Sequence, residues 1–130
     1  MKGMVHHIEL YVRNLKESIE FWDWLLKELG YEEYQKWDKG ISYKLQDTYL
    51  VLVQAEERFL DIPYNRCRAG LNHLAFHGGS PLFVDEITMK LKKKGVKILY
   101  EDKHPHAGGE DHYAVYFESP ERMKVEVVGE

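Results

Sequence analysis

The chain has 130 residues, of which 44% are hydrophobic and 31% charged, and its formal net charge at pH 7 is −4. This composition is that of a soluble globular protein. The acidic balance argues against nucleic acid or an anionic membrane as the main partner. The single cysteine, Cys67, excludes an internal disulfide and predicts a cytoplasmic location. No apolar run approaches the ~18 residues of a membrane span, so we expect no membrane partner.

The first half of the chain predicts a strand, a helix and three further strands. Residues 5–12 are rich in strand formers, and Asn14 is a helix cap followed by Glu17. An apolar stripe then predicts a helix that ends at Gly30, and its members are Leu15, Ile19, Trp22, Leu26 and Leu29. Three further strands are predicted at 31–37, 41–46 and 49–54.

The second half repeats this order. Residues 71–77 predict a strand, and Ser80 and Pro81 begin a helix that ends at Gly95. Strands are then predicted at 96–100, 113–117 and 124–128. The loop at 103–110 is longer than its counterpart in the first half.

Two β-α-β-β-β modules predict an α+β fold in a single domain that spans residues 1–130. Module 1 covers about 5–55, the connector 56–69, and module 2 about 70–129. Each module opens with a histidine near the start of its first strand, His7 or His73.

The repeat predicts a metal site. Alternation along a strand places His7, Glu9 and Tyr11 on one face, and His73 and His77 likewise share a face. The last strands of the modules should place Gln54 and Glu126 at equivalent positions. His7, Gln54, His73 and Glu126 would then supply the nitrogen and oxygen ligands of a divalent metal ion, with Ni, Zn, Mn, Fe and Co not distinguished.

Each of these residues also has a simpler interpretation. A lone histidine at a strand start is more often a satisfied polar residue than a ligand, and Glu126 could be a solvated strand residue. For proton transfer the candidate bases are Glu126 and Glu9. The loop at 104–109 is either a mobile flap over the pocket or a surface loop. The predicted pocket residues are Tyr11, His77, His112 and Tyr113, and the pattern leaves open whether His112 or Tyr113 faces the cavity.

Three stretches resemble the vicinal oxygen chelate superfamily, which includes glyoxalase I, methylmalonyl-CoA epimerase, extradiol dioxygenases and the bleomycin and fosfomycin resistance proteins. They read HHIELYVRNLKESIEFWDWLLKELGYE, GLNHLAF and YAVYFESPERMKVEVV. The last is similar to the family's D-P-D-G-x-x-x-E turn, with Ser119 in place of Asp and Arg122 in place of Gly. The resemblance implies a glyoxalase-like domain in which the metal ligands are His7, Gln54, His73 and Glu126.

The resemblance also implies a metal-dependent enzyme with lyase, isomerase or epimerase chemistry on a small metabolite chelated through vicinal oxygens. Three alternatives stay open: an extradiol dioxygenase, a fosfomycin thiol transferase, and a metal-free ligand-binding protein of the antibiotic-resistance type. The expected partner is a small-molecule substrate. Trp24, which does not fit the apolar stripe, suits a homodimer interface.

Overall fold

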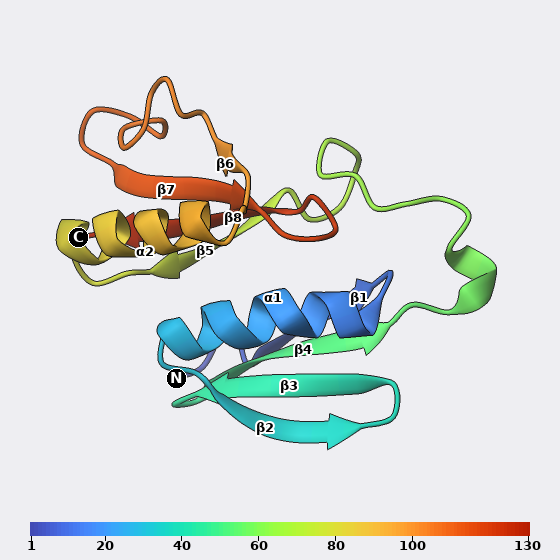
Figure 1. Ribbon diagram of the computed structural model, residues 1–130. Coiled ribbons are helices and arrows are strands. Elements are labelled where there is room, and N and C mark those ends of the chain that lie inside the picture. The colour runs from blue at the N-terminus through green and yellow to red at the C-terminus, as the bar shows by residue number, and fades with distance from the viewer. The chain divides into compact units, whose positions relative to one another are not determined.

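The computed structural model describes residues 1–130, which divide into two units, Met1–Pro63 and Tyr64–Glu130. The boundary falls inside the predicted connector at 56–69. Each unit contains one helix and one four-stranded mixed sheet, so the α+β class and the two tandem β-α-β-β-β modules are confirmed (Figure 1). Neither helix has the length and apolar character that crossing a membrane requires.

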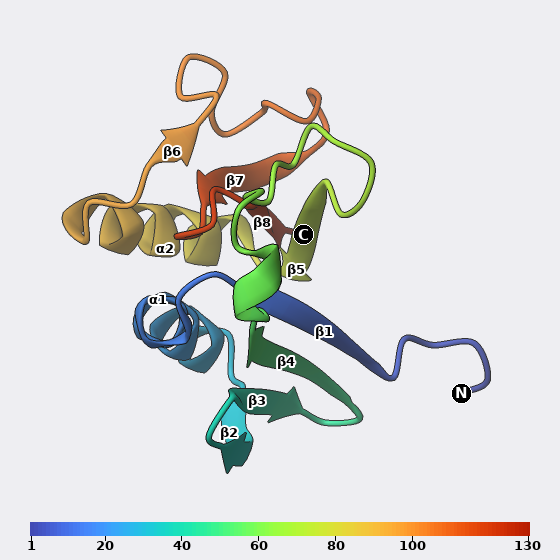
Figure 2. The same ribbon diagram turned by 90° about the vertical axis from the view of Figure 1, so that its right-hand side faces the viewer.

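In the first unit, the strand order across the sheet is β1-β4-β3-β2, with β1 parallel to β4 (Figure 2). The elements are β1 (His7–Val12), α1 (Leu15–Glu28), β2 (Glu32–Trp37), β3 (Gly40–Leu45) and β4 (Thr48–Gln54). Helix α1 packs against β2, β3 and β4. Its buried residues include Trp22, Leu25 and Leu26, as its apolar stripe requires.

The second unit has the same arrangement, with strand order β5-β8-β7-β6 and β5 parallel to β8. Its elements are β5 (His73–His77), α2 (Pro81–Lys93), β6 (Ile98–Leu99), β7 (Tyr113–Glu118) and β8 (Lys124–Gly129). Helix α2 packs on β6, β7 and β8 and buries Val84, Ile87 and Leu91. Strand β6 is shorter than the predicted 96–100: the Val96 N–H is bonded to the Leu91 carbonyl at the end of α2 (3.0 Å), and Tyr100, with left-handed backbone (φ 56°), ends the strand.

The predicted helix ends are confirmed. The side chain of Asn14 accepts a hydrogen bond from the Glu17 N–H (3.1 Å), and that of Ser80 accepts one from the Phe83 N–H (3.1 Å). Gly30 (φ 93°) and Gly95 (φ 78°) follow the two helices in the left-handed conformation that closes a helix. A short 3-10 helix, η1 (Glu57–Phe59), which the sequence did not indicate, lies in the connector.

Ser80→Ala should lower the free energy of unfolding by about 1 kcal/mol, because the Phe83 N–H loses its acceptor at the start of α2. Ser80→Asp, which keeps an oxygen acceptor, is the matched control and should stay close to wild type. Urea unfolding followed by circular dichroism measures both. An alanine variant as stable as wild type would show that this cap contributes nothing.

The register of each sheet determines which residues of the two modules are equivalent. His7 pairs with Tyr49 in β4, and His73 pairs with Lys124 in β8. Two residues further along each strand, Glu9 pairs with Val51 and Ala75 pairs with Glu126. The counterpart of Glu126 in the first module is therefore Val51, and the predicted equivalence of Gln54 with Glu126 is wrong.

Candidate functional site

A buried carboxylate, that of Glu126 in β8, is the centre of the polar cluster in the second unit. Glu126 is only 4% exposed. Its Oε1 lies 3.2 Å from Nε2 of His73 in β5, and its Oε2 forms a close contact with Nε2 of His112. Burying a carboxylate costs several kcal/mol unless partners compensate, and here both of its oxygens have one.

The face of the sheet that carries Glu126 is the one opposite α2. Tyr113 in β7 donates a hydrogen bond to Asp85 of α2, so Tyr113 faces the helix. Since alternate residues of a strand point to opposite sides, His112 and Tyr116 point away from the helix, towards Glu126. His112 therefore contacts the carboxylate, and Tyr113 does not.

Asn72 fixes the protonation pattern of the His73 ring. Its side-chain N–H donates to the Arg66 carbonyl (3.2 Å), which turns its Oδ1 towards Nδ1 of His73, 2.7 Å away. Because that amide oxygen can only accept, Nδ1 of His73 carries a proton. Nε2, the nitrogen that faces Glu126, needs a second proton to donate to the carboxylate, and a metal ion bound between the two would take the place of that proton. An imidazole that binds a metal through one nitrogen and donates from the other has the same pattern.

Tyr116 completes the surroundings of the carboxylate. Burial raises the pKa of the Tyr116 phenol to about 12, and the charge and hydrogen bond of Glu126 add to the effect. The phenol is therefore protonated at neutral pH and acts as a hydrogen-bond donor to the carboxylate. A base must have a pKa near the working pH, so Tyr116 does not meet the requirement for one.

The loop between β6 and β7 approaches this cluster at Gly108. A Cβ built on Gly108 would lie 2.5 Å from Cδ2 of His112 and 2.6 Å from the hydroxyl of Tyr116. Only a glycine leaves room for both rings in their present positions. The loop, for which the sequence left open a flap or a surface loop, thus approaches two partners of Glu126.

A cavity of about 480 Å³ adjoins His112. Besides His112 its lining residues are Asp111, Tyr113, Val128, Gly129 and Glu130. Two of the predicted pocket residues, His112 and Tyr113, therefore line this cavity. They do so although their side chains point to opposite faces of the sheet. Its volume is in the range of small-molecule sites.

His77 lies apart from this cluster. It shares a face with His73 but is at the other end of β5, where it pairs with Val128 and contacts Glu130. Its side chain is 88% exposed. Both Val128 and Glu130 line the cavity next to His112, and the pocket role of His77 stays a prediction.

The predicted residues of the first unit do not gather in one place. His7 stacks on Tyr49, with ring centroids 4.7 Å apart, at the start of β1. Gln54 pairs with Val12 at the end of the same strand. Its Oε1 accepts a hydrogen bond from the Leu15 N–H (2.9 Å) and its Nε2 donates to the Arg13 carbonyl (2.8 Å), so its amide caps the start of α1.

Two further predicted residues, Glu9 and Tyr11, are exposed on the face of β1 that also carries His7. Tyr11 and Gln54 line a cavity of about 530 Å³ at the end of this sheet, together with Lys39, Val53, Ala55, Glu56, Glu57 and Leu60. This cavity supports the prediction that Tyr11 lines a pocket. Glu9 as a base stays a prediction, as does the meeting of His7 with His73.

Sequence reasoning missed Asn72 and Gly108. Asn72 precedes His73 directly, and an amide beside a suspected ligand is a signal that could have been weighed. Gly108 belongs to a Gly-Gly pair that indicated only a flexible loop. Its close approach to His112 and Tyr116 depends on the folded loop, which has no local sequence signature.

Two βαβββ modules with a histidine and a buried glutamate on the helix-free face of one sheet define a glyoxalase-like protein. Residues 6–117 match the model of the Glyoxalase/Bleomycin resistance protein/Dioxygenase superfamily, and the chain belongs to this superfamily. It is 61% identical over 124 residues to the uncharacterized protein YqjT of Bacillus subtilis (strain 168), an alignment that covers 95% of this chain and 97% of YqjT.

Solved structures agree with this assignment. A candidate glyoxalase from Bacillus halodurans is 60% identical, with a TM-score of 0.98 over 99% of this chain and 97% of the other. The fosfomycin resistance protein FosX from Listeria monocytogenes, solved with Mn(II) and sulfate, has a TM-score of 0.70 at 19% identity over 99% of this chain and 91% of its own. At that identity the likeness shows the fold alone.

Proposed function

We propose that the protein is a metal-dependent enzyme that acts on a small oxygenated metabolite, and that His73 and Glu126 are metal ligands. The observation that carries this proposal is the hydrogen bond between Asn72 and Nδ1 of His73. It occupies Nδ1 and directs Nε2 of His73 towards the carboxylate of Glu126, so Nε2 is the nitrogen that would bind the metal.

The donor set suits a divalent ion of borderline softness, because it combines imidazole nitrogen with carboxylate oxygen. No group of three or more His, Cys, Asp or Glu side chains in the structure is arranged so that it could hold a metal ion. A complete metal site would therefore need a ligand in addition to His73 and Glu126. We propose His7, the matching histidine of the first module, as a further ligand. Gln54 is left out of the set, because its amide caps α1.

A divalent ion held here would act as a Lewis acid that polarises a substrate oxygen and stabilises developing negative charge on it. With a single carboxylate among the proposed ligands, the site keeps a net positive charge. It would therefore favour a substrate that binds through oxygen atoms and becomes more negative during the reaction. Lyase, isomerase and epimerase reactions that pass through an enolate have this property.

The residues around Glu126 have distinct roles in this proposal. His112 and Tyr116 hold the carboxylate in one orientation, and Gly108 lets the loop cover both rings. The cavity next to His112 is the proposed place for the substrate. Glu126 and Glu9 are the candidates for proton transfer. We also propose that the protein is a cytoplasmic homodimer.

Metal binding tests the proposal. Protein stripped of metal on a chelating resin should bind one divalent ion per chain, and its melting temperature should rise as Ni, Zn, Mn, Fe(II) or Co is added. Isothermal titration calorimetry measures the stoichiometry and ranks the metals. If none of the five ions binds, the protein is not a metalloenzyme of this kind, and the metal-free ligand-binding alternative takes its place.

A further inference from the structure

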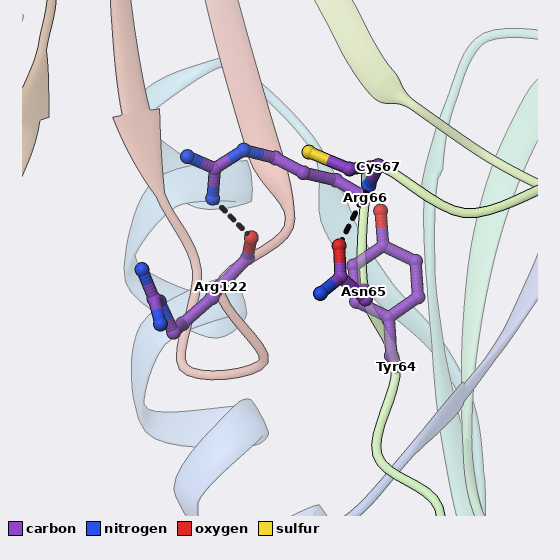
Figure 3. A pocket seen from close by; sticks show the side chains of 5 residues that line it. All are labelled: Tyr64, Asn65, Arg66, Cys67 and Arg122. Carbon is purple, nitrogen blue, oxygen red and sulfur yellow. Dashed lines mark hydrogen bonds between the residues drawn. The ribbon is translucent and has the colours of Figure 1, made fainter.

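A second, smaller cavity of about 170 Å³ lies in the second unit, at the turn between β7 and β8. It is lined by Tyr64, Asn65, Arg66, Cys67 and Arg122 (Figure 3). Figure 3 shows the guanidinium groups of both arginines on the same side of the cavity, with the Cys67 sulfur beside the stem of Arg66. None of these side chains contacts the carboxylate of Glu126, so the proposed metal site makes no use of them.

Hydrogen bonds hold the wall of this cavity in place. The Arg66 guanidinium, 20% exposed, donates from NH1 to Oε2 of Glu118 (2.6 Å) and to the Arg122 carbonyl (2.8 Å). The Asn65 side chain accepts from the Cys67 N–H (2.8 Å), and the Tyr64 hydroxyl donates to the Leu71 carbonyl (2.6 Å). A wall fixed in this way does not have to be ordered when a ligand enters, which lowers the entropic cost of binding.

Arg122 occupies a backbone conformation that disfavours most side chains. Its φ of 62° lies in the left-handed region, which is strained for a non-glycine residue. In this conformation the charged side chain of Arg122 lines the cavity. That side chain is 74% exposed, and only its Nε, 3.4 Å from Glu118, faces the neighbouring carboxylate.

The charges of the cavity do not cancel. Glu118 is the carboxylate that both arginines share. Burial alone would raise the pKa of Glu118, but the Arg66 hydrogen bond and the charges of Arg122 and Arg66 outweigh it and lower the pKa. The two guanidinium groups and the one ionised carboxylate leave a net charge of +1. Each guanidinium also carries five N–H groups that can donate hydrogen bonds to a ligand.

From this arrangement we infer that the cavity binds a small oxyanion, the phosphate or carboxylate group of a small molecule. Guanidinium groups present pairs of N–H donors with the spacing of phosphate and carboxylate oxygens. The volume of about 170 Å³ suits a single such group and is below the 300 Å³ at which sites for drug-sized ligands begin.

Cys67 provides a built-in reporter, because it is the only cysteine of the chain, is exposed and lines the cavity. Alkylation by iodoacetamide, which is uncharged, should slow when inorganic phosphate or acetate is bound. At an anion concentration about ten times its Kd the rate should fall roughly tenfold, since only the free protein reacts. The protein is first passed over a chelating resin, so that phosphate bound to a metal does not enter the measurement.

The phosphate and acetate arms show which oxyanion the cavity prefers, and sodium chloride at equal ionic strength controls for screening. Arg122→Asn should abolish the protection, because asparagine tolerates the left-handed backbone but carries no charge. Arg68→Gln is the matched control, since Arg68 follows Cys67 directly but does not line the cavity, and it should be protected like wild type.

Two results would overturn the inference. One is equal slowing by chloride, phosphate and acetate, which would show ionic screening instead of a site. The other is protection of Arg122→Asn as strong as that of wild type. Calorimetric titration of phosphate into the unmodified protein is a second measurement that does not depend on where the anion lies relative to the thiol, and absence of binding heat together with absence of protection rejects the site.

Discussion

Glu126→Gln should weaken metal binding by more than about 100-fold. Loss of a group that merely orients a ligand already costs 10- to 100-fold in metal affinity, and loss of a charged ligand costs more. Glutamine has nearly the same volume as glutamate, and its amide still accepts a hydrogen bond from one of the two imidazoles. The variant should therefore fold, which makes calorimetric titration of the metal a direct readout of the missing charge.

Glu130→Gln is the matched control, because Glu130 also contacts a histidine, His77, but its side chain is 58% exposed and it lies outside the Glu126 cluster. Its metal affinity should equal that of wild type. Asn72→Ala should lie between the two, because the His73 ring loses the acceptor that fixes its protonation pattern. If Glu126→Gln binds metal as tightly as wild type, Glu126 is not a ligand and the proposed site is wrong.

Local chemistry made much of the fold predictable from the sequence. Helix ends depend on residues a few positions apart, so Asn14 and Ser80 were identified as caps and Gly30 and Gly95 as the ends of the helices. Alternation along residues 112–117 placed His112 and Tyr116 on one face. It could not tell which face looks away from the helix, because that depends on the contact between Tyr113 and Asp85 in α2.

The register of parallel strands was not predictable in this way. Counting from His7 selected Gln54, whereas pairing across the sheet selects Val51, three residues earlier. A shift by an odd number of residues also changes the face of the sheet to which a side chain points. Gln54 consequently lies on the side of α1 and bonds to the Leu15 N–H, while Val51 is on the side of His7.

Because Val51 and not Gln54 is equivalent to Glu126, the two modules differ in the side chains that they can offer to a metal ion. The position that carries a carboxylate in β8 carries a valine, 4% exposed, in β4. The first module therefore has a histidine but no carboxylate at the position equivalent to Glu126, and the buried carboxylate lies in the second module alone. Such asymmetry explains why the proposed ligand set contains one carboxylate.

The second large effect concerns alkaline pH, where the free energy of unfolding should fall because of Tyr43. The side chain of Tyr43 is fully buried in β3, and its hydroxyl donates to Oδ1 of Asp23 (2.9 Å). Burial raises the pKa of Tyr43 far above its usual value near 10, and the hydrogen bond and charge of Asp23 add to the increase.

The sign follows from proton release. Below pH 10 tyrosine is protonated in both the folded and the unfolded chain, and its contribution to stability is complete. Above pH 10 the unfolded chain releases the proton first, so each pH unit removes about 1.4 kcal/mol until the pKa of the folded state is reached. Urea unfolding at pH 7, 9, 10 and 11, followed by the fluorescence of the tryptophans, all of which lie in the first unit, measures this loss.

Tyr43→Phe isolates the effect. At pH 7 the variant should be less stable than wild type by about 1 kcal/mol, the net value of a hydrogen bond. By pH 11 wild type should be no more stable than the variant. The unfolded wild-type chain has then released the Tyr43 proton, whereas phenylalanine has no proton to release. Tyr34→Phe, at an exposed position of β2, should leave the pH dependence of wild type unchanged. A constant difference between wild type and Tyr43→Phe from pH 7 to 11 would mean that the Tyr43 phenol titrates equally in the folded and unfolded chain.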